Sequence, residues 1–368
     1  MVRKPIDSLH ESQYNACSNM YNGPRAQEVS MAVLTPDEVA RKIRMSPATV
    51  RRYIRDGDLP AKKVGGEWRV DSQALATFIG TLPDQAGPKI QIIAVANQKG
   101  GVGKTTSAVA LAAGLADLGQ RTLFIDLDPQ GGGTGWLGFD STQRYLSLGD
   151  IMKDAAKSQT DPDLTPAIVR IEENLDLVPA HINMTGLDLE IGGTMEREWI
   201  LHEVVTAVAG RYDKIILDLP PTLTLLAVSG LLAADTVIIP QIPDAVSVQG
   251  LGQLADTLKH LRRMKERRGE TLTVLGVVLT QVRAGTNHHR QYRQFIGDFC
   301  TASGIPFLSA PTEEERTDPR FVEIPQAIGV PDARGLGIPL SRYRKAAEAS
   351  AAYRHLAQLL IPVEALHV

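Results

Sequence analysis

The feature that most constrains this chain is a glycine-rich loop between an apolar run and a helical pattern. The run at residues 90–96 reads IQIIAVA, and the octapeptide KGGVGKTT follows at residues 99–106. Beyond the loop, Ala108, Leu111 and Leu115 recur at helical spacing. Glycines let backbone N–H groups curl around an anion, and the N-terminus of the following helix adds a favourable dipole. The sequence therefore predicts a strand, a phosphate-binding loop and a helix, in that order.

Individual residues of the loop have distinct expected roles. Lys104 is expected to reach the β- and γ-phosphates of ATP, and the Thr105 hydroxyl to hold Mg²⁺. The usual pattern has glycine at position 98, where this chain has Gln98. The predicted ATP-binding residues are the whole octapeptide: Lys99, Gly100, Gly101, Val102, Gly103, Lys104, Thr105 and Thr106.

Two further apolar runs end in acidic residues. The run RTLFIDL contains Asp126 and is followed by Asp128, and the run KIILDLP contains Asp218. Ligands bind outside the carboxyl ends of the strands in open α/β sheets. We therefore expect Asp218 to hold Mg²⁺ through water, and Asp126 to support Mg²⁺ and the adjoining loop. Acidic residues at a strand end can also be plain caps, so the prediction depends on the order of the three motifs.

From residue 90 onward, apolar β-rich runs alternate with helical patterns. Near-continuous apolar strands between helices are typical of a mostly parallel sheet sandwiched by helices. We therefore predict an α/β fold of the P-loop NTPase class. The predicted strands are the runs IQIIAVA, RTLFIDL, LDLVP, KIILDLP, DTVIIP, TVLGVVLT and the shorter IPFL.

A smaller pattern precedes the predicted sheet. Thr35 and Glu38 predict a capping box at the start of a first helix, and a second helix follows after a short turn. Gly65-Gly66 between two short β-rich segments predicts a two-residue hairpin turn, and Asp71 is the expected cap of a third helix. Two helices followed by a hairpin are the plan of a winged helix-turn-helix domain.

The 368 residues thus divide into four predicted segments. A polar, aperiodic stretch opens the chain, and a segment rich in proline and glycine separates the two patterns. The segments are a disordered tail (1–30), the winged helix-turn-helix domain (31–82), a linker (83–89) and the P-loop ATPase domain (90–368).

Charge supports DNA binding by the small N-terminal domain. Nine basic and five acidic residues between positions 35 and 70 give a local charge of +4, whereas the whole chain carries −3. The charges could also be the solvated face of a protein-interaction module. In the second helix, the residues expected to reach base edges and phosphates are Thr49, Arg51, Arg52 and Tyr53. The expected phosphate contacts of the wing are Lys62, Lys63 and Arg69.

The motifs together resemble known families. KGGVGKTT, DLDPQG and KIILDLPP resemble, in this order, the deviant phosphate-loop ATPases of the ParA/MinD superfamily, and ParA-type partition ATPases within it. The resemblance covers most of residues 90–362, and residues 34–79 resemble a MerR/excisionase-type winged helix. The motif near residue 324 begins IPQ where many relatives have IPR, and residues 131–133 are all glycine after DPQ.

The resemblance implies a mechanism. Lys99 matches the lysine that crosses a dimer interface to the partner's phosphates, and Asp128 matches the aspartate that positions the attacking water. It implies weak Mg²⁺-dependent ATP hydrolysis, a nucleotide sandwich dimer that binds DNA without sequence preference, and stimulation by a ParB-type partner. The winged helix would bind the protein's own operator.

Two basic clusters are candidates for the non-specific DNA contacts, and each is also compatible with a solvated helix face. The first is Arg342, Arg344 and Lys345, and the second is Arg262, Arg263, Lys265, Arg267 and Arg268.

Several other functions fit the sequence less well. Cys17 and Cys300 are the only cysteines, so neither a disulfide framework nor the cluster of nitrogenase iron protein is expected. The C-terminal segment lacks the basic face of the MinD membrane helix, and no signal peptide is apparent, so we expect a cytoplasmic, nucleoid-associated protein with no membrane contact. Two alternatives stay open: an ATP-gated transcription regulator, and a ParA-like ATPase that positions a protein cargo.

Overall fold

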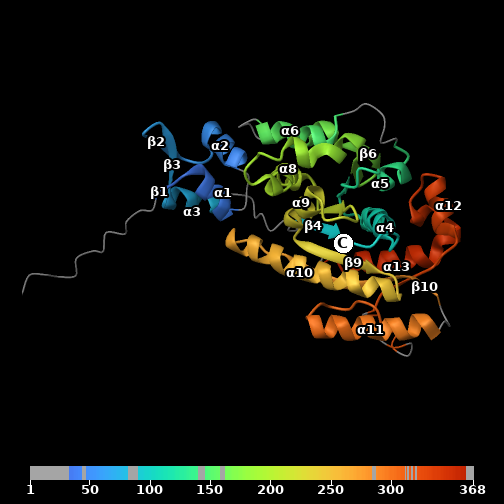
Figure 1. Ribbon diagram of the computed structural model, residues 1–368. Helices are drawn as coiled ribbons and strands as arrows, with labels where there is room; N and C mark the ends of the chain where they lie inside the picture. Colours follow the sequence, from blue (N-terminus) through green and yellow to red (C-terminus); the bar gives the residue numbers. More distant parts are fainter. Residues whose placement is uncertain are drawn as a thin grey trace, which may run out of the picture. The chain divides into compact units, whose positions relative to one another are not determined.

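The structure is a computed structural model of the chain, which divides into two compact units, residues 1–83 and 84–368 (Figure 1). It describes residues 33–43, 47–81, 90–139, 146–157, 162–283, 287–310, 312, 315, 318–319 and 321–361. The predicted tail and linker lie outside the described residues, so both stay predictions.

The first unit is a small three-stranded sheet with three helices. Its elements are β1 (Val33–Leu34), α1 (Pro36–Ile43), α2 (Pro47–Asp56), β2 (Ala61–Val64), β3 (Glu67–Asp71) and α3 (Ser72–Thr81). The strands are antiparallel in the order β1-β3-β2. Buried Val39, Val50, Leu59 and Phe78 join the helices and the sheet in one core.

The local signals of this unit are confirmed. The Glu38 carboxylate accepts from the Thr35 N–H at 2.8 Å, and the Thr35 hydroxyl accepts from the Glu38 N–H at 3.2 Å, which closes the capping box. Gly65 and Gly66 have φ values of 63° and 89°, as the tight turn between β2 and β3 requires. The Asp71 carboxylate accepts from the Gln73 N–H at 2.7 Å at the start of α3.

The second unit is built on an eight-stranded sheet in the order β11-β10-β9-β4-β8-β5-β7-β6. Every neighbouring pair is parallel except β6 and β7 at one edge. The strands are β4 (Gln91–Val95), β5 (Thr122–Asp126), β6 (Val169–Glu172), β7 (Leu175–Val178), β8 (Lys214–Asp218), β9 (Thr236–Gln241), β10 (Thr273–Val282) and β11 (Glu323–Pro325).

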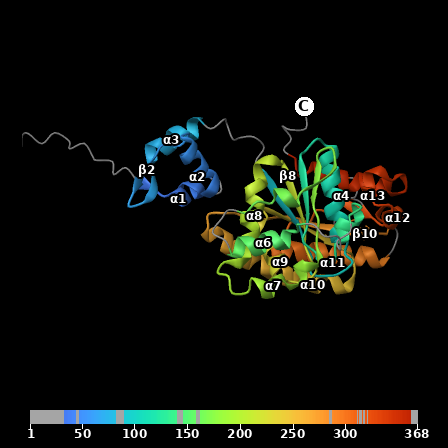
Figure 2. The same ribbon diagram turned by 90° about the horizontal axis from the view of Figure 1, so that it is seen from above.

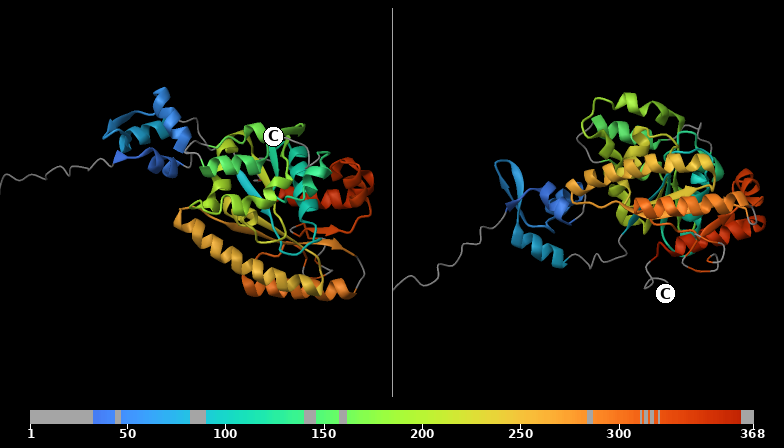
Figure 3. Two further views of the ribbon diagram at one scale, coloured as in Figure 1. Left: turned by 45° about the horizontal axis from the view of Figure 1, so that its top comes forward. Right: turned by 60° about the horizontal axis from the view of Figure 1, so that its bottom comes forward.

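Helices cover both faces of this sheet, as predicted (Figure 2). One face carries α4 (Lys104–Asp117), α5 (Gly132–Trp136), α12 (Gly329–Gly335) and α13 (Ala347–Gln358). The other carries α6 (Leu148–Lys157), α7 (Leu187–Glu190), α8 (Ile200–Val208), α9 (Leu225–Ala233), α10 (Ala245–Arg267) and α11 (Asn287–Ser303). Figure 3 shows α10 and α11 lying side by side on their face.

Strand alternation explains the two layers. In β4, Ile92 and Ala94 face the α8 and α9 layer, while Ile93 and Val95 face the α4 and α13 layer. Both sets are buried, so the central strands are apolar throughout, which is why they appeared in the sequence as continuous apolar runs.

One predicted strand does not form. The IPFL segment makes only an isolated bridge between Phe307 and Val277, and the strand beside β10 is β11. Pro306 has no N–H to donate to a ladder. Gly276 (φ 154°) allows the segment close to β10, because a Cβ there would lie 2.7 Å from the Pro306 carbonyl oxygen.

The described ranges also contain short 3-10 helices at Thr165–Ala167, Ile182–Gly186, Arg197–Trp199, Ala209–Arg211, Leu340–Arg342 and Arg344–Ala346. Within the described ranges, no helix combines the length and apolar character needed to cross a membrane.

Candidate functional site

The glycine-rich loop leaves the sheet at its centre. Strand β4 lies between β8 and β9, and α4 begins at Lys104, so the predicted order of strand, loop and helix is confirmed. Gly101 and Gly103 have φ values of 76° and 85°, a region that a side chain disfavours. Gly103 is the N-cap of α4, and the backbone N–H groups of the first helical turn are therefore directed into the loop.

Two side chains at the end of β10 hold the loop in place. The Thr280 hydroxyl donates to the Val102 carbonyl at 2.7 Å, and the Gln281 side-chain amide donates to the Gly101 carbonyl at 2.7 Å. Gln281 itself has a φ of 53°, which is strained for a residue other than glycine. Sequence reasoning missed both residues, although Thr280 ends the apolar run TVLGVVLT and Gln281 follows it, so both had to emerge at the ligand edge of the sheet.

Lys104 lies at the base of the loop. Its side chain is buried, and its ammonium donates to the Lys99 carbonyl at 2.9 Å. Burial lowers the pKa of Lys104, while the charges of Asp218 and Asp128 act in the opposite direction. The negative charges of both acidic residues therefore stabilise the ammonium, but they offset only part of the cost of burying it.

The Asp126 carboxylate accepts hydrogen bonds from α5 and from the turn that precedes it. One carboxylate oxygen accepts from both the backbone N–H and the hydroxyl of Thr134, each at 2.8 Å, and the other accepts from the Asp128 N–H at 3.2 Å. Burial raises the pKa of Asp126, and these hydrogen bonds lower it in part. Asp126 therefore fixes the turn before α5, and both of its oxygens are already engaged.

Asp218 is the contrasting case. It pairs with Asp126 in the register of β5 and β8, and its side chain is fully buried. Neither carboxylate oxygen has a hydrogen-bond partner among the described residues. The nearby Thr105 hydroxyl lowers the pKa of this carboxylate, against the larger effect of burial. Burial and the charge of Asp126 raise the pKa of Asp218 well above its ordinary value. A buried carboxylate without a hydrogen-bond partner is costly, so this position fits a divalent cation.

Asp128 lies at the mouth of the same site. It is half-buried, and its carboxylate accepts from the Gln130 N–H at 3.0 Å. Its charge acts on Asp126, Asp218 and Lys104. The structure thus gathers Lys104 and the three predicted aspartates at one edge of the sheet.

The side chain of Lys99 forms an ion pair with a residue outside the loop. Its ammonium lies 2.6 and 2.8 Å from the two carboxylate oxygens of Asp244, in the segment between β9 and α10. Both side chains are partly exposed. Asp244 was not among the residues predicted from the sequence.

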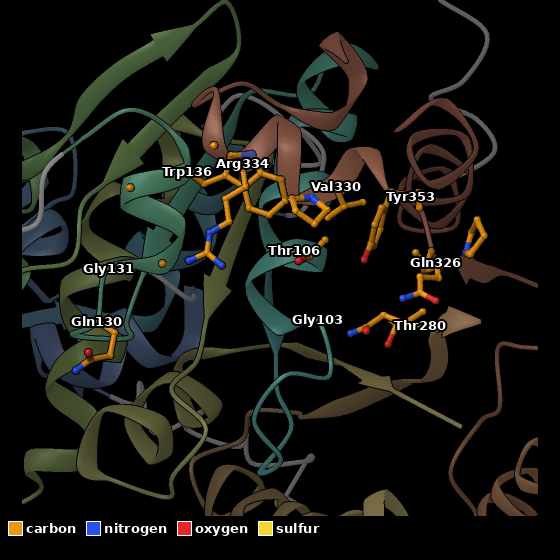
Figure 4. Close-up of a pocket in the computed structure, with 18 residues that line it drawn as sticks. Gly103, Thr106, Gln130, Gly131, Trp136, Thr280, Gln326, Val330, Arg334 and Tyr353 are labelled. Carbon is orange, nitrogen blue, oxygen red and sulfur yellow. The ribbon is translucent and has the colours of Figure 1, made fainter. Parts of the chain in front are cut away.

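A cavity of about 630 Å³ adjoins the loop (Figure 4). Gly103 and Thr106 form one wall, Thr280 and Gln281 another, and α12 and α13 contribute Val330 and Tyr353. A cavity of this size with mixed apolar and amide walls suits a nucleoside. Gln326, where the motif departs from IPR, also lines it and accepts a hydrogen bond from Arg283.

The basic residues of the first unit are partly paired. Arg51 forms an ion pair with Asp37 at 2.9 Å, and Arg69 with Glu67 at 2.7 Å. Tyr53 packs edge-on against Phe78, 5.1 Å between ring centroids. The other candidates with described side chains are exposed: Arg52, Lys62 and Lys63. The Thr49 side chain lies outside the described part of the structure.

The basic clusters of the second unit also differ in availability. The Arg342 guanidinium lies 2.7 Å from Asp117 and 3.4 Å from Glu172, whereas Arg344 and Lys345 are exposed. In the second cluster, Lys265 is 1% exposed and donates to the Ala234 carbonyl at 2.6 Å. Lys265 is therefore a buried structural lysine, and its inclusion among the DNA-contact candidates was wrong.

Comparison with known proteins agrees with this geometry. Residues 90–270 match a family model described as an AAA domain, and residues 33–81 match one described as a helix-turn-helix domain. The chain is 40% identical over 198 residues to the sporulation initiation inhibitor protein Soj of Bacillus subtilis, a match that covers 54% of this chain and 75% of Soj.

Two longer matches extend the likeness. The chromosome partitioning protein ParA of Caulobacter vibrioides is 32% identical over 277 residues, covering 75% of this chain and 95% of that protein. A solved structure, cobyrinic acid a,c-diamide synthase from Mycobacterium smegmatis with a bound ATP analog and magnesium, matches with a TM-score of 0.59 at 30% identity, over 74% of this chain and 94% of that one. The chain thus belongs to the ParA and Soj family of chromosome-partitioning ATPases.

Proposed function

We propose that this protein is a DNA-partition ATPase that hydrolyses ATP with Mg²⁺ and whose affinity for DNA depends on the bound nucleotide. The observation that carries the proposal is the buried carboxylate of Asp218, which has no hydrogen-bond partner among the described residues, beside the glycine-rich loop that leads into α4. Such a carboxylate needs a cation, and such a loop needs an anion, so a magnesium–nucleotide complex satisfies both at once.

The chain's own groups suit this ligand. Thr105 and Asp218 would hold Mg²⁺, which when bound would neutralise charge on the phosphates, and Asp126 would keep the turn before α5 in place. Lys104 would reach the β- and γ-phosphates from the base of the loop. Asp128, at the mouth of the site, would orient the attacking water.

Dimerisation is the proposed switch. A Lys99 that contacts the phosphates of a second subunit must leave Asp244, so ATP binding and dimer formation compete with this ion pair. A ParB-type partner would accelerate hydrolysis and so return the protein to monomers. The cytoplasm and the nucleoid surface are the proposed place of action.

Two DNA-binding modes follow from the two units. Exposed Arg344 and Lys345 would contact phosphates without sequence preference, and their affinity would fall steeply with salt. In the winged helix, α2 would enter the major groove. Arg52 on α2 and Lys62 and Lys63 on β2 are exposed basic residues that could contact the DNA.

The winged helix favours a second candidate function, an ATP-gated transcription regulator. In that case the ATPase unit would control operator binding, and the non-specific mode would be absent. The exposed basic residues of the first unit are the observation behind this alternative.

One assay distinguishes these functions. Binding of the full chain to random DNA and to its own promoter is measured with no nucleotide, with MgADP and with a non-hydrolysable ATP analogue, alongside the rate of phosphate release. ATP-dependent binding to random DNA supports partition, and nucleotide control of the promoter alone supports regulation. If Lys104→Ala binds ATP as wild type does, the assignment of the loop fails. Asp128→Ala should bind ATP and hydrolyse it poorly.

A further inference from the structure

A guanidinium from α12 lies over the glycine turn that precedes α5. A Cβ built on Gly132 would lie 3.6 Å from the Thr105 hydroxyl oxygen and 3.7 Å from one terminal nitrogen of Arg334. The Arg334 guanidinium and the Thr105 hydroxyl therefore both lie close to Gly132. In Figure 4, Arg334 extends from α12 toward Gly131, on the side of Thr106 away from Thr280 and Gln326.

The Arg334 side chain is exposed, and it forms no ion pair with the described residues. It is the single charged side chain among the eighteen residues that line the cavity beside the loop. The carboxylate of its neighbour Asp332 accepts from the Tyr343 hydroxyl at 3.2 Å instead. A cation without a carboxylate in a cavity that adjoins a phosphate loop favours an anionic ligand.

The position of the cavity narrows the choice of ligand group. Lys104, proposed to reach the β- and γ-phosphates, does not line it, and neither do Asp128 and Asp218, whereas Gly103 and Thr106 do. The cavity therefore lies on the nucleoside side of the loop. A guanidinium that lines this cavity together with Gly103 and Thr106 would meet the phosphate groups nearest the ribose.

We propose that Arg334 is a nucleotide-binding residue that contacts the α- or β-phosphate of a bound nucleoside di- or triphosphate. This inference rests on the proposed function, because it takes the loop to be a nucleotide site. Its planar guanidinium presents two parallel N–H donors to phosphate oxygens, a geometry that lysine cannot reproduce. The α12 segment would thereby be coupled to nucleotide occupancy, since Arg334 is anchored at one end by its helix and at the other by the ligand.

Calorimetric titration of the full chain with MgADP and with a magnesium complex of a non-hydrolysable ATP analogue tests the proposal. Arg334→Gln should raise the Kd for both nucleotides by about tenfold, and Arg334→Lys by less, because the charge remains while the paired donors are lost. Arg354→Gln is the matched control, since Arg354 is exposed on α13 and does not line the cavity. Melting of each nucleotide-free variant checks its fold.

The outcomes separate this inference from the proposed function. Wild-type Kd values in Arg334→Gln overturn it, and so does a loss confined to the ATP analogue, which would assign Arg334 to the γ-phosphate or to the dimer. Lys104→Ala is titrated in parallel. Loss of binding in Lys104→Ala with wild-type binding in Arg334→Gln rejects the arginine contact and leaves the nucleotide site standing, whereas normal binding in Lys104→Ala rejects both.

Discussion

The ammonium of Lys99 lies 2.6 Å from the carboxylate of Asp244 within one subunit, so the loop lysine and the segment before α10 are held together by charge. The pair joins the loop after β4 to the segment after β9, on neighbouring strands. A lysine in this pair is unavailable to a second subunit. The ion pair therefore opposes the dimer that we propose ATP to stabilise.

Asp244→Asn should make dimerisation easier. A partly exposed ion pair contributes about 0.2–1 kcal/mol, so the ATP concentration at half-dimer should fall by about 1.4-fold to fivefold. Light scattering across an ATP titration measures this shift. Lys99→Ala is the companion variant, which should bind ATP and stay monomeric. An unchanged or higher half-dimer concentration in Asp244→Asn would argue against the competition.

Asp218→Asn should stabilise the nucleotide-free protein while weakening its response to Mg²⁺. The variant removes a buried charge without a partner, which is worth about 1–3 kcal/mol. When the pKa of an acid is higher in the folded than in the unfolded state, the free energy of unfolding falls as pH rises above the unfolded-state pKa of about 4. The stability advantage of the variant should therefore be largest near neutral pH and shrink as pH is lowered toward that value.

Thermal melts with and without MgATP measure both effects. Asp213→Asn is the control of opposite sign. Burial raises the pKa of Asp213, but its hydrogen bonds and ion pair with Arg121 outweigh burial and lower it, so the substitution should destabilise at neutral pH. A nucleotide-free Asp218→Asn that melts below wild type would mean that Asp218 has a structural partner.

Gln281 offers a test of the loop clamp. Gln281→Gly relieves a strain of about 1 kcal/mol at φ 53° and removes the hydrogen bond to Gly101, whereas Gln281→Ala removes the bond and keeps the strain. Both should weaken nucleotide binding severalfold, and only the alanine variant should lower the melting temperature clearly. Affinities that follow the melting temperatures in both variants would reduce Gln281 to a purely structural residue.

Arg52 should matter more than Arg51 for operator binding. Arg51 is tied to Asp37 at 2.9 Å, while Arg52 is exposed and lies 5.5 Å from the Tyr53 ring centroid. Arg52→Ala should weaken promoter binding and reduce the slope of log K against log salt by about one, with ATP turnover unchanged. Equal losses in the two single variants, measured by fluorescence anisotropy across salt, would contradict this ranking.

Local patterns in the sequence predicted much of the fold correctly. The capping box at Thr35 and Glu38 and the turn at Gly65-Gly66 depend on residues within a few positions of one another, so local chemistry decides them. The central strands could be predicted because both of their faces are buried, which makes them continuous apolar runs in the sequence. The order of loop and acidic motifs predicted which residues meet at the edge of the sheet, since parallel strands bring their carboxyl ends together.

Tertiary structure decided which residues distant in the sequence contact these motifs. Only the folded chain pairs Lys99 with Asp244, places Gln281 against Gly101 and brings Arg334 over Gly132. It also buries Lys265, which sequence alone left among the DNA candidates, and pairs β10 with Glu323–Pro325 in place of the IPFL segment. The physical reason is common to all of these: strand order and packing bring together residues far apart in sequence, and no periodicity or local motif encodes such a contact.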